Sequence, residues 1–164
     1  MLTDDTRRTL LATGGLGLGA SLLASLQANA QAPKWSAQEQ ANVAAVNAFL
    51  HSAKPRDFTA GAQYLAPEVT YRMTETSPPD KGYEAIVKRL APFVDNADQI
   101  VFEILATQAM GPIVINHRVD RFISKTRPLL FEGVGVFFLK DGKIREWTDY
   151  TIRAALANDW PARR

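Results

Sequence analysis

Two carboxylates, an arginine and a tryptophan stand at short spacings in the second half of this chain. Arg118 and Asp120 are two residues apart in one largely apolar segment, and Trp147 and Asp149 repeat that spacing in another. Because successive side chains of a β-strand point to opposite faces, each pair shares a face if its segment is a strand. Burial and mutual repulsion keep one of two neighbouring carboxyl groups protonated, and an arginine between them holds their geometry. These residues could therefore supply a general acid and a general base to one pocket.

A β-sheet is needed to bring the four side chains together. Three consecutive segments have the alternation or the apolar composition of neighbouring strands, and they span residues 113–123, 129–139 and 143–150. Alternation places Asn116 and Phe122 on the face that carries Arg118 and its neighbouring aspartate. If the three strands lie side by side in one curved sheet, Arg118 falls between the two aspartates at the mouth of an apolar pocket.

The first half of the chain after residue 33 predicts helices. Their expected ranges are residues 36–52, 57–65 and 83–93. Ser36 and Glu39 have the spacing of a capping box at the start of the first helix. Residues 69–73 alternate as a short strand, and residues 154–157 predict a last helical turn. The order of elements indicates an α+β fold, in which a curved, mostly antiparallel sheet carries three N-terminal helices on its concave face around a cone-like pocket.

Composition excludes several classes of function. The 164 residues, of which 46% are hydrophobic and 22% charged, suit a single globular domain. The net charge is only +2 and the basic residues are dispersed, so we expect no nucleic-acid partner. The chain has no cysteine and only two histidines, so we expect no thiolate nucleophile and no metal site.

The first thirty residues have the pattern of an export signal. They contain Arg7 and Arg8 near the start, then an apolar run, and they end in small residues up to Ala30. Residues 6–11 resemble a twin-arginine motif, although the general secretory route is also open. We expect cleavage after Ala30, a periplasmic mature domain of residues 31–164, and no stable membrane association after cleavage.

Residues 113–152 resemble the limonene-1,2-epoxide hydrolase family. The resemblance is carried by Arg118-Val119-Asp120, Gly133-Val134-Gly135-Val136-Phe137, Asp141-Gly142-Lys143-Ile144 and Trp147-Thr148-Asp149-Tyr150. That family has a cone-shaped α+β fold shared with ketosteroid isomerase and SnoaL-like polyketide cyclases. The resemblance implies a cofactor-independent epoxide hydrolase that adds water to a small apolar epoxide in one step, giving a vicinal diol without a metal or a covalent intermediate.

The same resemblance implies a role for each residue. Asp149 would be the base that takes a proton from water, Asp120 the acid that protonates the epoxide oxygen, and Arg118 the bridge between them. Tyr71 matches a tyrosine that helps to hold the water, whereas Met73 stands where the family has an asparagine. A thioether is a weak acceptor and no donor, so the water would lose one of its contacts.

The sequence also offers residues that could replace the lost contact to the water, and it predicts which side chains line the pocket. Thr74 or Asn116 would have to supply the missing contact to the water. The expected pocket-lining side chains are Met73, Asn116, Phe122 and Trp147.

Two other functions remain open on the sequence. One is an isomerase or dehydratase of the same fold, in which one carboxylate abstracts a carbon-bound proton while Tyr71 and a protonated Asp120 hold an oxyanion. The other is a non-catalytic module that binds an apolar ligand.

A homodimer is expected through the outer face of the sheet. On the strand at residues 113–123 the outward side chains Ile115, Val119 and Ile123 are too apolar for a solvated surface.

Overall fold

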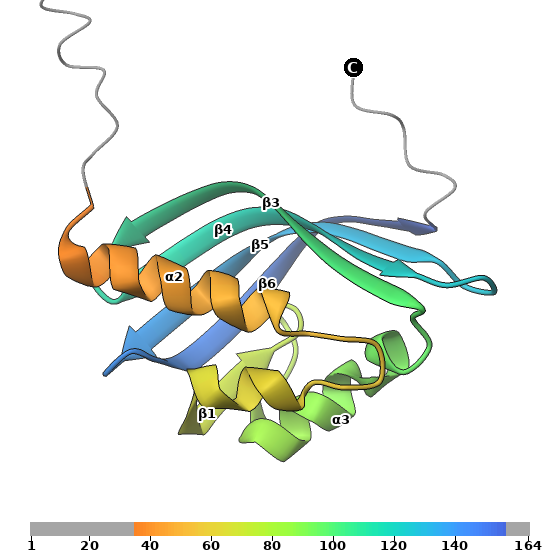
Figure 1. Ribbon diagram of the computed structural model, residues 1–164, viewed down its shortest axis with the longest axis horizontal. Helices are drawn as coiled ribbons and strands as arrows, with labels where there is room; N and C mark the ends of the chain where they lie inside the picture. Colours follow the sequence, from red (N-terminus) through yellow and green to blue (C-terminus); the bar gives the residue numbers. More distant parts are fainter. Residues whose placement is uncertain (1–34, 157–164) are drawn as a thin grey trace, which may run out of the picture. The chain divides into compact units, whose positions relative to one another are not determined.

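This computed structural model describes residues 35–156. They contain a six-stranded mixed sheet. In chain order its strands are β1 (Leu65–Arg72), β2 (Asp80–Lys81), β3 (Gln99–Met110), β4 (Ile113–Ile123), β5 (Leu129–Lys140) and β6 (Lys143–Leu156). The spatial order is β2-β1-β6-β5-β4-β3, so β3 to β6 form an antiparallel meander that β1 joins in parallel at β6 (Figure 1). The predicted export signal, residues 1–30, lies outside the described residues.

The turn between β5 and β6 helps to set the register of these two strands, and β6 carries Asp149. Asp141 and Gly142 both have positive φ, 52° and 74°, which is the backbone of a two-residue type I′ hairpin. The register shifts once, just beyond the turn, and then pairs Gly135 with Asp149. The predicted strands at 113–123, 129–139 and 143–150 are thus neighbours, with the glycine-containing strand in the middle.

Two α-helices, α2 (Ala37–His51) and α3 (Tyr83–Val94), pack on the concave face of the sheet (Figure 1). The predicted capping box of α2 is confirmed. The Ser36 hydroxyl accepts a hydrogen bond from the Glu39 N–H at 3.2 Å, and the Glu39 carboxylate accepts from the Ser36 N–H at 2.8 Å. No helix among residues 35–156 combines the length and apolar character needed to cross a bilayer.

Two predictions about individual segments were wrong. Residues 57–65 form no α-helix but the 3-10 helix η1 (Thr59–Tyr64), in keeping with a short segment that contains Gly61, and Leu65 already belongs to β1. Residues 154–156 extend β6 instead of forming a helical turn, because they pair with β5 and this ladder overrides the helix propensity of alanine. The sheet itself is mostly antiparallel, as predicted, and of its strand pairs only β1 with β6 is parallel.

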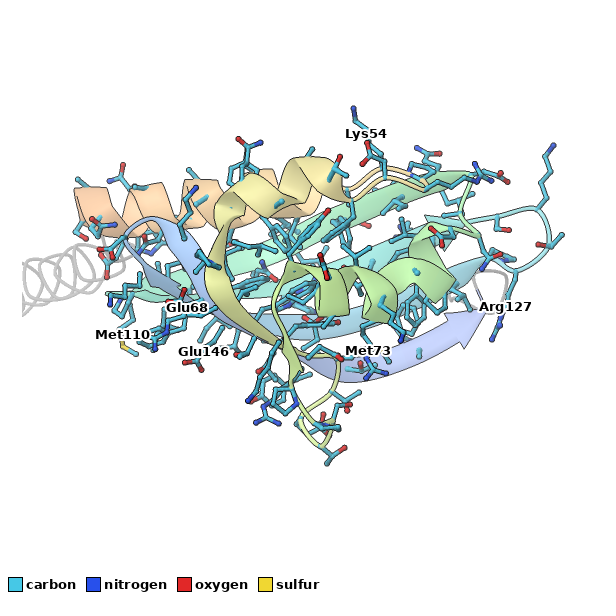
Figure 2. All side chains as sticks on the ribbon, turned by 90° about the horizontal axis from the view of Figure 1, so that it is seen from below. Lys54, Glu68, Met73, Met110, Arg127 and Glu146 are labelled. Atoms are coloured by element: carbon cyan, nitrogen blue, oxygen red, sulfur yellow. The ribbon has the colours of Figure 1, made fainter. Side chains whose placement is uncertain are left out.

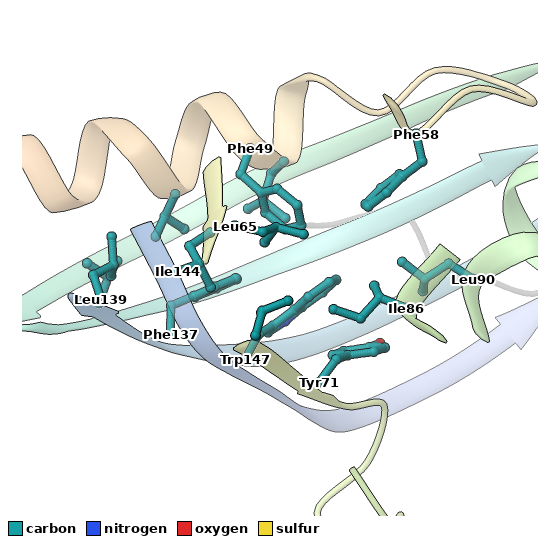
Figure 3. Packing of buried hydrophobic residues seen from close by; sticks show 14 of the residues in the cluster. Phe49, Phe58, Leu65, Tyr71, Ile86, Leu90, Phe137, Leu139, Ile144 and Trp147 are labelled. Atoms are coloured by element: carbon teal, nitrogen blue, oxygen red, sulfur yellow. The ribbon is translucent and has the colours of Figure 1, made fainter. Parts of the chain in front are cut away.

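The hydrophobic core lies between the helices and the concave face (Figure 3). The Phe49 ring of α2 lies edge-on to Trp147 at 5.3 Å between centroids, and Tyr71 lies 4.0 Å from the same tryptophan. Tyr71 and Trp147 are only 2% and 4% exposed. Packing of this kind fixes aromatic side chains in place, so their polar atoms point in defined directions.

The convex face of the sheet is less apolar than predicted. Ile115 and Ile123 are 37% and 41% exposed, but Val119 between them is fully buried. Val119 lies opposite Glu103 of β3 and Glu132 of β5. Glu103 forms an ion pair with Arg121, and Glu132 Oε1 lies 2.9 Å from His117 Nε2. The charged side chains that surround Val119 on this face leave it no accessible surface.

Candidate active site

The Arg118 guanidinium lies at the centre of a buried polar cluster. Its Nε donates to Asp120 Oδ1 at 2.8 Å, its Nη1 to Asn116 Oδ1 at 3.0 Å, and its Nη2 to Asp149 Oδ1 at 2.7 Å. The Arg118 side chain is 3% exposed, while those of Asp120 and Asp149 are 14% and 16% exposed. Burial alone would lower the pKa of Arg118, but the two carboxylates raise it above its ordinary value, so the arginine stays charged.

Glycine on the central strand makes this cluster possible. Arg118 and Asn116 belong to β4 and Asp149 to β6, with β5 between them, so the guanidinium must reach across β5. Gly135 lies opposite both Asn116 and Asp149. A Cβ atom at Gly135 would come within 2.1 Å of Arg118 Nη1 and 3.0 Å of Asn116 Oδ1. Gly135 was not among the predicted site residues, although a glycine inside an apolar strand signals close approach of another group.

Three donors hold the Asp149 carboxylate. Besides Arg118, the Trp147 indole N–H donates to its Oδ1 at 2.9 Å, and the Tyr71 hydroxyl donates to its Oδ2 at 3.1 Å. Burial and the Asp149 charge raise the pKa of Tyr71 well above its ordinary value, so the phenol remains a donor. A carboxylate has about four acceptor sites, so Oδ2 keeps capacity for one further donor. This arrangement suits a residue that works in its ionised form.

Asp120 has the opposite environment. Its Oδ1 accepts from Arg118, but its Oδ2 has no hydrogen-bond partner among residues 35–156. On the two neighbouring strands, Phe102 of β3 and Phe131 of β5 lie directly opposite Asp120. Burial raises the pKa of Asp120 to about 6, against the lowering effect of the arginine and with a further increase from the Asp149 charge. At pH 6 about half of Asp120 therefore holds a proton, and at pH 7 about a tenth does, so that the Oδ2 away from Arg118 can carry it.

Both aspartates and the arginine line an apolar cavity of about 320 Å³. Among the predicted pocket residues, Met73, Phe122 and Trp147 contribute to its wall, and Tyr71 does as well. A single cavity thus contacts a carboxyl group with a raised pKa, a second carboxyl group held by three hydrogen-bond donors, and a large apolar surface. This is the arrangement expected of a binding site for a small apolar molecule.

Asn116 was wrongly predicted to line the pocket. It is fully buried beside Arg118, to which its Oδ1 is committed, and its Nδ2 has no partner among the described residues. Asn116 therefore cannot hold a water molecule in the cavity. Thr74 does line the cavity, but its hydroxyl lies 2.7 Å from that of Ser77. Met73, just past the end of β1 (Figure 2), leaves Tyr71 and Asp149 as the polar contacts on that side.

Comparisons with known proteins agree with this fold. The profile of the SnoaL-like domain family matches residues 46–147. An LEH-like epoxide hydrolase from M. tuberculosis is 25% identical with a TM-score of 0.59, and the alignment covers 69% of this chain and 84% of that one.

Two more distant structures show the fold alone. Bal32a, from a soil-derived mobile gene cassette, is 13% identical with a TM-score of 0.60, covering 70% of this chain and 92% of that one. An NTF2-like protein of unknown function from Burkholderia pseudomallei K96243 is 15% identical with a TM-score of 0.56, covering 68% and 90%. No curated protein matches the chain. With its α+β NTF2-like architecture and a family match over most of the described residues, the chain belongs to the SnoaL-like domain family.

Proposed function

We propose that this protein is a cofactor-independent epoxide hydrolase that adds water to a small apolar epoxide in one step. The observation that carries the proposal is the difference between the two aspartates bound to Arg118. Asp149 accepts hydrogen bonds from three donors, whereas Asp120 has a raised pKa and an oxygen, beside the cavity, that has no hydrogen-bond partner among residues 35–156. The likeness to an LEH-like epoxide hydrolase at 25% identity supports the same reaction class.

The proposed step moves two protons and exchanges one bond for another. Asp149 Oδ2 takes a proton from water while the water oxygen forms a bond to one epoxide carbon. The bond from that carbon to the ring oxygen breaks, and the ring oxygen receives the proton of Asp120. The product is a vicinal diol. Arg118 stays protonated and holds both carboxyl groups, and the two aspartates regain their starting states by proton exchange with solvent.

The water in this scheme has fewer anchors than the family pattern provides. The Tyr71 hydroxyl donates to Asp149 and can accept a hydrogen bond from the attacking water, while Asp149 accepts another. Met73 replaces an asparagine and offers neither strong donor nor strong acceptor. We therefore expect a slower reaction than an asparagine at this position would give, and Met73→Asn is the variant that should increase the rate.

The geometry favours hydrolysis over the isomerase alternative. An oxyanion pair needs Tyr71 and a protonated Asp120 to donate to one substrate oxygen. In this site the Tyr71 hydroxyl donates instead to Asp149 Oδ2. A non-catalytic ligand-binding module would bind apolar epoxides without forming product, and Asp149→Asn would then leave affinity nearly unchanged.

Labelled water tests the proposal. Mature protein in excess over a panel of terpene, cyclohexene and styrene-type oxides should give diol that carries ¹⁸O from the solvent in a single turnover. Asp120→Asn and Asp149→Asn should each nearly abolish diol formation with the fold retained, while Asp98→Asn, at an exposed position, should not. Label that comes from the protein, or a double variant Asp120→Asn/Asp149→Asn that stays active, would contradict the mechanism.

We further propose a homodimer through the convex face. Ile115 of β4 and Phe138 of β5 lie on that face and are 37% and 39% exposed. Exposed apolar side chains on adjoining strands are typical of a sheet face that pairs with a second copy. Light scattering should give a dimeric mass that Ile115→Asp reduces to a monomer, and a monomeric wild-type protein would refute the proposal.

Export of the chain is also a proposal. Arg7 and Arg8 precede an apolar run that ends in small residues at Ala30. Protein recovered from the periplasm should begin at Gln31, and replacing both arginines with lysine should retain the full-length precursor in the cytoplasm if the twin-arginine route is used.

A further inference from the structure

Four phenylalanines from four different elements form one wall of the cavity. This set, the phenylalanine arm, consists of Phe93 of α3, Phe102 of β3, Phe122 of β4 and Phe131 of β5. Phe122 is its centre, with ring centroids 5.6 Å from Phe93, 6.2 Å from Phe102 and 6.1 Å from Phe131. The other three rings remain partly accessible, so the arm presents aromatic surface to a molecule in the cavity.

The arm adjoins the proposed acid directly. Asp120 is the cross-strand partner of both Phe102 and Phe131, and Phe122 follows it by two residues on the same face. Side chains in directly opposite positions of an antiparallel pair are about 5 Å apart at Cβ. An epoxide whose oxygen receives the proton of Asp120 therefore lies with one of its substituents against the arm.

The arm offers no hydrogen-bonding side chain. The cavity residues that α3 and β3 contribute are Leu90, Phe93, Val94 and Phe102, all apolar. Among the described residues, the polar side chains of the cavity come from β1 and the loop after it, β4 and β6. A hydroxyl or a charge placed against the arm would leave water without gaining a side-chain partner, which is unfavourable.

We propose that the substrates are aryl oxiranes, in which an aromatic ring without polar substituents is attached directly to an epoxide carbon. This inference rests on the proposed epoxide hydrolase function and adds the substrate class. Edge-on and tilted ring contacts attract an aromatic ring beyond the effect of its buried area, which a saturated ring of similar size does not gain. A cavity of about 320 Å³ is at the small end of the range of about 300–1,000 Å³ that is typical of small-molecule sites, so it suits a compact substrate. Phenyloxirane is one such compact molecule.

Three substrates measured with the same preparation test the proposal. We expect kcat/KM for phenyloxirane to exceed that for cyclohexyloxirane by about two- to tenfold. Phenyloxirane with a hydroxymethyl group on the ring should react about five- to a hundredfold more slowly than phenyloxirane itself, because the hydroxyl is desolvated against the arm. Rates without enzyme are subtracted for each oxirane.

Matched leucine variants connect the preference to the arm. Phe122→Leu keeps an apolar side chain but removes the central ring, so the phenyl to cyclohexyl ratio should fall toward one. If Phe122→Leu does not fold, Phe102→Leu, at a partly exposed position, is the substitute variant. It should also lower the ratio. Met110→Leu, at an exposed position of β3 outside the cavity, is the control and should leave the ratio unchanged.

The outcomes separate the substrate class from the function. Equal kcat/KM for phenyloxirane and cyclohexyloxirane, with diol formed from both, would overturn the aryl preference and leave epoxide hydrolysis standing. A preference for phenyloxirane that both Phe122→Leu and Phe102→Leu retain would also overturn the role of the arm. No diol from any oxirane would refute the proposed function itself.

Discussion

Replacing Gly135 with alanine should break the arginine–carboxylate cluster without altering any group that takes part in the chemistry. The added Cβ would lie 2.1 Å from Arg118 Nη1 and 2.8 Å from the Phe137 ring. To regain an ordinary contact of 3.4 Å, the guanidinium nitrogen must move by about 1.3 Å. The hydrogen bonds of Arg118 are 2.7 to 3.0 Å long, and such a shift exceeds the range that hydrogen-bond geometry allows.

The cost follows from two effects. Overpacking of a filled interior costs about 1–3 kcal/mol, and disruption of a buried ion pair costs about 3–5 kcal/mol. The two overlap, because moving the arginine relieves the clash, so we expect Gly135→Ala to lose about 3–5 kcal/mol of unfolding free energy. That is a large fraction of the stability of a typical domain, about 5–15 kcal/mol.

Urea unfolding followed by tryptophan fluorescence measures this loss, and diol formation by the folded fraction measures the effect on the site. Val136→Ala, at the next position of β5 and on its opposite face, is the control and should lose only about 1 kcal/mol with its activity retained. If Gly135→Ala stays within about 1 kcal/mol of wild type and forms diol at an unchanged rate, then the close approach of Arg118 to β5 is not what holds the cluster together.

Further predictions follow from the same site. Diol formation should decline as the pH rises through about 6, since Asp120 must be protonated; a kcat/KM that is flat from pH 5 to 9 would argue against its role as the acid. Because the folded pKa of Asp120 is raised from 3.8 to about 6, its contribution to stability is present below pH 4 and is lost as pH rises toward 6, amounting to about 3 kcal/mol. Urea unfolding measures the unfolding free energy at pH 4 and at pH 8, and the difference between the two values should be smaller in Asp120→Asn than in the wild type. Arg118→Leu leaves two buried carboxyl groups without their cation, so it should lose about 3–5 kcal/mol at pH 8 and less at pH 4, and an equal loss at both would count against the pairing. Tyr71→Phe should lower the rate of diol formation with the fold retained, which near-UV circular dichroism can verify, and an undiminished rate would remove the tyrosine from the mechanism.

Tertiary pairing overruled several local signals in the sequence. Alanine at 154 and 155 favours a helix by propensity, but these residues lie opposite the start of β5 and complete its ladder as part of β6. Val119 is outward by alternation, but it is fully buried, with Glu103 and Glu132 opposite it on the neighbouring strands. The parallel pairing of β1 with β6 joins segments far apart in the chain, and no local pattern encodes it.

Asn116 shows the limit of reasoning from alternation. Alternation placed it on the same face as Arg118 and Asp120, and the structure agrees. The concave face of the sheet, however, includes both the cavity wall and the closely packed region beside it. Asn116 lies in the packed region, where it accepts a hydrogen bond from Arg118. Which of the two regions a side chain reaches depends on what the neighbouring strand places opposite it, here a glycine.

Local sequence by itself determined most of the elements and the alternation of side chains along the strands. The capping box at Ser36, the Asp141-Gly142 hairpin, and the shared face of Arg118 and Asp120 all depend on residues within a few positions of one another. The tertiary structure decided which groups meet, and the burial that it imposes raises the pKa of Asp120. Distance between strands, burial and hydrogen-bond partners set those properties, and they arise only when β4, β5 and β6 are aligned in one sheet.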